Sequence, residues 1–240
     1  MRQSLLVSVI LFGFAIVFVP KPSFAAGDAK AKYKEGVALG NSGKIEEAIE
    51  AFRDALRADP KMYQAALDLG QALRIKKRLP EAVAAYEIAV KEQPKALKAR
   101  QGLAEALFDA RAYLTAQVHL SEWVKLDEKA VDAWFMLGRA QSNTGKKDVA
   151  LDTLNRVTSL KSDHVGATYE IAEIYAEKGE NDKAIQFYEI AVRIKDDQPL
   201  AWYGMALTYD KLGNTAKTKE SAQKACDQGH KTACKWAARL

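Results

Sequence analysis

The chain has few of the residues on which enzyme and metal sites most often depend. Its 240 residues include only two cysteines and three histidines, and His119, His164 and His230 are far apart in the sequence. It contains no glycine-rich phosphate-binding loop, no His-Glu-x-x-His motif and no nucleophile-elbow motif. These absences argue against the common classes of NTPase, hydrolase and zinc enzyme. We therefore expect a protein without catalytic residues, metal or cofactor.

Charge and hydropathy exclude two further classes. The chain has 36 basic and 31 acidic residues, a formal net charge of +5. This excess is mild for a chain of this length, so nucleic acid is not the expected partner. Beyond the N-terminal segment, no stretch is apolar over the roughly 20 residues that a membrane-spanning helix needs.

Residues 1–25 have the layout of a secretory signal peptide. Arg2 supplies a positive charge, an apolar run follows over Leu5–Val19, and the small residues Ser23 and Ala25 precede a cleavage site before Ala26. We therefore expect an exported protein of the periplasm or cell envelope, cleaved between Ala25 and Ala26. The alternative is that the segment is retained as an N-terminal membrane anchor.

A period of about 34 residues runs through the rest of the chain. Pro60 and Pro94 are one period apart, and each follows an apolar-periodic segment. When Ala29 is taken as position 1, small residues recur at positions 8 and 20 and larger ones at position 24. Position 8 is occupied by Gly36, Gly70, Ala104, Gly138, Ala172 and Ala206, and position 24 by Phe52, Tyr86, Leu120, Leu154, Tyr188 and Ala222.

These columns predict two packed helices in each period. Small residues at positions 8 and 20 allow the two backbones to approach, and the residue at position 24 fills the space beside them. Glycine at position 15 suits the left-handed residue that ends a first helix. Lys77 and Arg111 replace this glycine, so we expect those two turns to close differently. Pro80 falls near the start of a second helix, where proline is tolerated.

The pattern resembles the tetratricopeptide repeat family, which has the same period and helix–turn–helix unit. The resemblance implies an all-α, right-handed solenoid of six repeats with a short C-terminal capping helix. Repeat 3, with Arg100 and Trp123, and repeat 6, with Ala222, depart from the family pattern, so we expect altered packing there. The expected repeats are 29–62, 63–96, 97–130, 131–164, 165–198 and 199–230, and the expected cap is 231–240.

The resemblance also implies a concave groove that binds a peptide or helix of a partner protein. Position 5, which lines this groove in the family, is occupied by Tyr33, Leu67, Gln101, Phe135, Tyr169 and Tyr203. The expected polar surround consists of Gln71, Arg74, Lys98, Glu105, Asp109, Arg139, Asn143, Glu173 and Asp210. The alternative is that the aromatic residues only pack between repeats. The Lys and Asn residues with which some family members clamp a C-terminal carboxylate are absent.

The two cysteines, Cys226 and Cys234, lie near the C-terminus on either side of Gly229. Residues 225–234 look like the cysteine-rich α/α repeats related to this family, in which such a pair forms a disulfide. Export makes oxidation plausible. The alternatives are a metal site that includes His230, and two free thiols.

The leading interpretation is a non-catalytic scaffold or adaptor in the periplasm or cell envelope. One alternative is a membrane-tethered accessory factor for secretion, pilus or envelope polysaccharide assembly. Another is a glycan or cell-wall fragment binding protein. The basic run Arg74–Arg78 is either a contact for anionic lipid or an acidic partner, or a solvated turn.

Overall fold

The computed structural model describes residues 26–240, and all regular secondary structure in this range is helical. The predicted signal peptide lies outside the described residues. The helices are α1 (Ala26–Asn41), α2 (Ile45–Ala58), α3 (Tyr63–Ile75), α4 (Leu79–Glu92), α5 (Leu97–Asp109), α6 (Tyr113–Leu126), α7 (Val131–Asn143), α8 (Lys147–Leu160), α9 (Val165–Glu177), α10 (Asn181–Ile194), α11 (Pro199–Lys211), α12 (Thr215–Asp227) and α13 (Lys231–Ala237).

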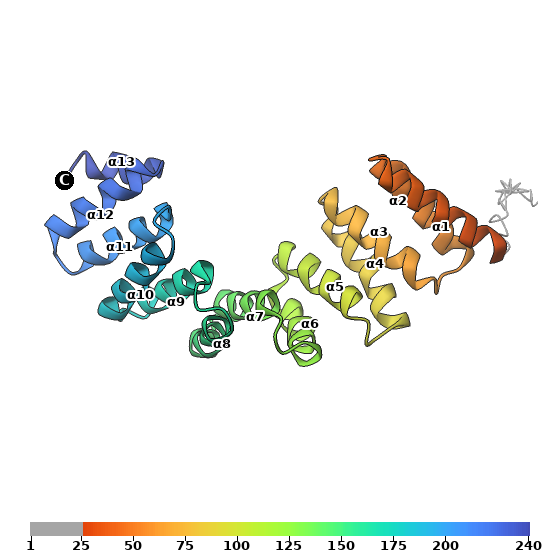
Figure 1. Ribbon diagram of the computed structural model, residues 1–240, viewed down its shortest axis with the longest axis horizontal. Coiled ribbons are helices and arrows are strands. Elements are labelled where there is room, and N and C mark those ends of the chain that lie inside the picture. The colour runs from red at the N-terminus through yellow and green to blue at the C-terminus, as the bar shows by residue number, and fades with distance from the viewer. Residues whose placement is uncertain (1–25) are drawn as a thin grey trace, which may run out of the picture.

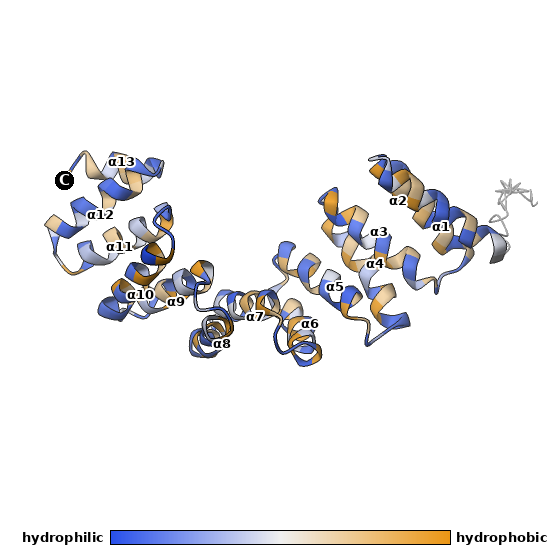
Figure 2. Cartoon of the chain, viewed as in Figure 1, coloured by the Kyte–Doolittle hydropathy of each residue, from blue (hydrophilic) through white to orange (hydrophobic). Residues whose placement is uncertain are grey.

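Consecutive helices pack as pairs, and each pair packs against the next one along the chain. Figure 1 shows the pairs following an arc from α1 to α13, with α6 and α8 on its outer side. Every pair contributes both hydrophilic and hydrophobic residues, as Figure 2 shows. The predicted all-α solenoid of six helix pairs and a closing helix is confirmed. Within residues 26–240, no helix combines the length and apolarity that crossing a bilayer requires.

The predicted contact between positions 8 and 24 is also confirmed. A Cβ added to Gly36 would lie 2.6 Å from Phe52 Cδ1, and one added to Gly138 would lie 2.7 Å from Leu154 Cγ. The glycines therefore make room for the large residue of the second helix. Pro80 lies in the first turn of α4, as expected.

The prediction that the turns at Lys77 and Arg111 close differently is wrong. Both residues have a φ of 58°, in the same left-handed region as Gly43, which has a φ of 80°. The backbone hydrogen bonds also match, since Arg78 N donates to Leu73 O at 2.9 Å where Lys44 N donates to Leu39 O at 3.0 Å. Helix packing on either side of these turns thus imposes one turn geometry, and two L-residues adopt it at a cost in backbone energy.

Repeat 3 and repeat 6 accommodate their unusual residues differently. In repeat 3, Trp123 is buried within the core that links α2 to α7. In repeat 6, Ala222 leaves space that the closing helix fills, because Trp236 and Ala237 of α13 pack against it. The cap therefore supplies the bulk that position 24 lacks.

A disulfide joins Cys226 of α12 to Cys234 of α13, with their Cα atoms 4.5 Å apart. Gly229, with a φ of 90°, makes the turn between the two helices. His230 Nδ1 accepts a hydrogen bond from Ala233 N at 3.1 Å and so caps α13. The metal-site alternative is therefore wrong, because both sulfurs are bonded to each other and His230 has a structural partner. In the described part of the chain, no cluster of His, Cys, Asp and Glu could hold a metal ion.

Candidate partner-binding groove

Three adjoining pockets line the inner faces of α1, α3, α5 and α7. The first has a volume of about 260 Å³ and lies between α1, α2 and α3; the second, about 280 Å³, lies between α3 and α5; and the third, about 300 Å³, lies between α5 and α7. Gln71 lines the first two, and Arg74 and Glu105 line the last two. We call this continuous surface the α1–α7 groove. Each pocket is at or below the lower end of the roughly 300–1,000 Å³ of small-molecule sites, so each suits one side chain.

In the first pocket, the floor is apolar and includes Phe52, which also packs against the ring of Tyr33. The Tyr33 hydroxyl donates to Asp68 Oδ2 at 2.9 Å. Burial, reinforced by this hydrogen bond, raises the pKa of Tyr33 to about 12, and burial also raises the pKa of Asp68. Tyr33 is therefore a neutral donor that links repeat 1 to repeat 2.

The second pocket has Leu67 and Tyr86 at its base and Gln71 and Lys98 at its edge. Tyr86 belongs to α4, but its ring reaches the groove because Gly102 of α5 has no side chain. Burial raises the pKa of Tyr86 to about 12. Its phenol therefore stays neutral at physiological pH, and the pocket combines an apolar base with two cations, Lys98 and Arg74.

An ion pair between Arg74 and Glu105 separates the second pocket from the third. Glu105 also accepts a hydrogen bond from Gln101 Nε2 at 2.9 Å. The attraction of Glu105 outweighs burial and raises the pKa of Arg74, although burial is the largest single influence. The pair fixes two long side chains across the groove.

The third pocket combines an apolar base with an excess of acidic groups. Phe135 and Met136 form the base, and Asp109 and Asp132 stand beside it together with Arg74 and Glu105. The Phe135 ring is held from two sides, by His164 with ring centroids 4.6 Å apart and by the Arg139 guanidinium 5.5 Å from its centroid.

Arg139 itself is held by contacts within the solenoid. It lies over the Phe108 ring, 5.3 Å from the centroid, and its Nε is 2.8 Å from Glu170 Oε1. Asn143 donates to the backbone oxygen of Arg139 at 2.8 Å, within α7. Two predicted groove residues, Arg139 and Asn143, are thus committed to internal contacts.

In repeats 5 and 6 the predicted aromatic groove residues pack against other parts of the chain. Tyr169 lies beside Tyr188, with ring centroids 6.1 Å apart, and the Tyr188 hydroxyl donates to Glu173. The Tyr203 ring stacks on His230 with centroids 4.2 Å apart and meets the edge of Trp236. Asp210 is exposed on α11. Of the predicted stripe, Leu67, Gln101 and Phe135 line the groove, and Tyr33 packs behind it against Phe52.

Sequence reasoning missed four residues of the second and third pockets and, apart from Gln71, the whole lining of the first pocket. Tyr86 and Gly102 enter the groove through a contact between repeats, and Asp132 and Met136 lie at positions that were not assigned to it. Glycine recurs at position 6 of the repeat, as Gly102 and Gly204, and this recurrence could have indicated the contact of Tyr86 with Gly102. The role of the whole set in partner binding stays a prediction.

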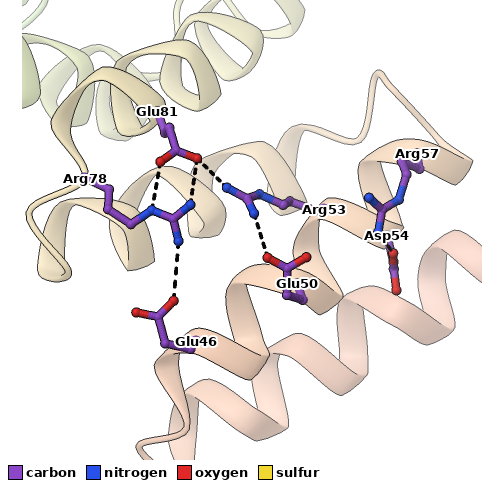
Figure 3. Close-up of polar contacts among 7 residues, drawn as sticks. All are labelled: Glu46, Glu50, Arg53, Asp54, Arg57, Arg78 and Glu81. Carbon is purple, nitrogen blue, oxygen red and sulfur yellow. Dashed lines mark hydrogen bonds and ion pairs between the residues drawn. The ribbon is translucent and has the colours of Figure 1, made fainter.

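The basic run Arg74–Arg78 is mostly neutralised by acidic residues. Besides the Arg74–Glu105 pair, Lys76 Nζ lies 3.2 Å from Glu46 Oε1. Arg78 donates to both carboxylate oxygens of Glu81 and also pairs with Glu46, as Figure 3 shows. The same figure shows Arg53 joining Glu81 to Glu50. This network links α2 to α4, and the Arg74 pair reaches α5, so contacts of repeat 2 with repeats 1 and 3 account for most of the run.

The family matches agree with this architecture. A tetratricopeptide repeat model matches residues 33–96, 78–117 and 135–199, and a second tetratricopeptide repeat model matches residues 200–228. Together these matches span more than half of the chain. The chain belongs to the tetratricopeptide repeat family. Proteins of this family are generally protein-binding scaffolds, and no catalytic family is among the matches.

Solved structures with the same fold include other repeat proteins. The MamA protein is 27% identical, with a TM-score of 0.65, over 72% of this chain and 95% of that one. YrrB, described as a TPR protein with an unusual peptide-binding site, is 22% identical with a TM-score of 0.63. The match covers 80% of this chain and 100% of YrrB. A tetratricopeptide repeat protein from Parabacteroides merdae is 16% identical with a TM-score of 0.71. The match covers 84% of this chain and 80% of that protein. No curated protein matches the chain.

Proposed function

We propose that this protein is a scaffold or adaptor that binds an extended segment of a partner protein in the α1–α7 groove. The observation that carries the proposal is the row of three adjoining pockets, each the size of one side chain, along four successive repeats. YrrB, which shares the fold, is described as having a peptide-binding site, so the fold is compatible with this activity.

The geometry sets the length of the partner segment. Packed helices are about 8–10 Å apart, and an extended chain advances about 3.3 Å per residue. A segment therefore needs about three residues per repeat, or about nine to pass from α1 to α7. Main-chain groups of such a segment would lie over the polar side chains of Gln71 and Gln101, which can donate and accept hydrogen bonds.

The glycan-binding alternative has less support. It needs exposed aromatic faces, but Tyr203 stacks on His230 and Tyr169 lies against Tyr188.

For location, we propose export to the periplasm or cell envelope on the basis of residues 1–25. The mass of the mature chain tests this, because a retained segment favours the tethered accessory factor.

The binding test uses Gln71→Trp, which places a large side chain where the first and second pockets meet. Gln71 is exposed, so the substitution leaves the core intact. Gln186→Trp, at an exposed position of α10, is the matched control. Both variants and the wild type are crosslinked to proteins of the source cell's envelope fraction. We expect the same captured proteins with wild type and Gln186→Trp and their loss with folded Gln71→Trp. Equal capture by all three would refute the groove.

A further inference from the structure

The charges of the α1–α7 groove are unequal between its second and third pockets. The third pocket is lined by three carboxylates and one guanidinium, and that guanidinium, on Arg74, is already paired with Glu105. Asp109 and Asp132 are exposed, and neither forms an ion pair within residues 26–240. Two carboxylates thus stand beside the pocket without an ion pair of their own, because Arg74, the one cation in its lining, is paired with Glu105.

The second pocket has the opposite excess. Lys98 is exposed at its edge, and its ammonium forms no ion pair in the described structure. Burial raises the pKa of Asp68, and the attraction of Lys98 opposes this shift without overcoming it. Along the groove, a cation therefore comes one repeat before a pair of carboxylates.

The base of the third pocket suits a long side chain that ends in a charge. Phe135 and Met136 offer an apolar surface, and His164 and Arg139 hold the Phe135 ring in place. Lysine and arginine bury an apolar stem while their charged end stays in a polar environment. A stem lying on Phe135 and Met136 would bring its cation toward Asp109 and Asp132.

We propose that the groove selects segments with a lysine or arginine over Phe135, between Asp109 and Asp132, and an acidic residue about three positions away beside Lys98. The proposal rests on the proposed function, since it specifies the partner of the same groove. Exposed charge pairs contribute modestly to affinity and more to choice of partner. Reversing both carboxylates should weaken the selected peptides about tenfold, as two such pairs become repulsive.

The experiment selects binders from a displayed library of random nonapeptides. The bait is the wild type, Asp109→Lys with Asp132→Lys, or a control pair with the same change of net charge, Asp152→Lys with Asp182→Lys. The control residues are exposed on α8 and α10. Gln71→Trp serves as a fourth bait, and circular dichroism verifies that each variant is folded.

We expect wild type and the control pair to enrich lysine or arginine three positions from an acidic residue. The reversed groove should enrich acidic residues at the former basic position. If wild type selects peptides that Gln71→Trp rejects, but they show no basic preference or the preference survives the reversal, this inference is wrong while the proposed function stands. If no peptide is enriched, or Gln71→Trp binds the same ones, both are wrong.

Discussion

The ring of Tyr86 in α4 occupies the place where Gly102 of the next repeat would carry its side chain. A Cβ on Gly102 would lie 2.3 Å from Tyr86 Cε1. Tyr188 and Gly204 repeat the arrangement three repeats later, with a Cβ 2.6 Å from Tyr188 Cζ. Each tyrosine thus packs between two first helices and connects its own repeat to the following one.

Gly102→Ala should therefore destabilise the protein although alanine favours helices. The added methyl group must displace the Tyr86 ring, and overpacking of this kind costs about 1–3 kcal/mol. The gain in helix propensity is about 1 kcal/mol, so we expect a net loss of up to about 2 kcal/mol in the free energy of unfolding. Urea denaturation followed by circular dichroism measures it.

Gly40→Ala is the matched control for that experiment. Gly40 is also helical, but the nearest atom to its added Cβ would be Ala48 Cβ at 3.9 Å, an ordinary contact. We expect a gain of up to about 1 kcal/mol. If both alanine variants change stability in the same direction, the proposed steric role of Gly102 is wrong.

Lys77→Gly and Arg111→Gly should each stabilise the protein by about 0.5–1 kcal/mol. Both residues have a φ of 58°, where a side chain costs about 1–2 kcal/mol and glycine does not. Glycine's greater freedom in the unfolded chain offsets part of this gain. Thermal unfolding of each variant tests the prediction.

Ala110→Gly is the control for the turn at Arg111. Ala110 is the neighbouring residue, with a φ of −74°, so glycine there relieves no strain and should destabilise by about 0.4–1 kcal/mol. Stabilisation by Ala110→Gly, or destabilisation by Arg111→Gly, would contradict a strain localised at the left-handed residue.

The sequence predicted contacts within a repeat better than contacts between repeats. The pairing of Gly36 with Phe52 follows from two helical faces and a fixed spacing, so the columns reveal it. The contact of Tyr86 with Gly102 and the ion pair of Arg74 with Glu105 depend on the angle at which successive repeats stack. The length and residue pattern of the repeat do not specify the angle between successive repeats.

The turns show a second limit of sequence reasoning. Glycine marks a left-handed residue, but its absence at Lys77 did not mean that the conformation was absent. Tertiary packing on both sides overrode the local preference. The same priority of packing explains why Tyr203, expected in the groove, stacks on His230, the residue that caps α13.

Loss of the disulfide should weaken only the C-terminal end of the solenoid. Cys226 and Cys234 are separated by 8 residues, and closing so short a loop stabilises by about 2–3 kcal/mol on the chain-entropy model. Repeats interact mainly with their neighbours, so the effect should stay local. In a variant with both cysteines changed to serine, amide hydrogen exchange should accelerate in α12 and α13 and stay unchanged in α1 to α4. The wild type under reducing conditions should behave alike, and uniform acceleration along the chain would contradict this local role.

Glu170→Gln should make stability less dependent on pH. Burial outweighs the attraction of Arg139 and raises the pKa of Glu170 above its ordinary value of 4.5. The folded state therefore binds a proton at Glu170 more tightly than the unfolded state does. The contribution of Glu170 to the stability of the wild type consequently declines as pH rises above about 4.5. Glutamine cannot ionise, so the stability of Glu170→Gln relative to wild type should increase across that range.

Glu122→Gln gives the opposite sign and completes the test. A hydrogen bond from Lys125 lowers the pKa of Glu122, so its carboxylate stabilises the folded state above the unfolded pKa and loses that contribution as pH falls. The stability of Glu122→Gln relative to wild type should therefore decrease as pH rises. Urea midpoints of both variants between pH 3 and 8 measure the two trends. If the relative stabilities of both variants change with pH in the same direction, burial does not control the protonation of Glu170. A raised pKa at Glu170 and a lowered pKa at Glu122 require changes in opposite directions.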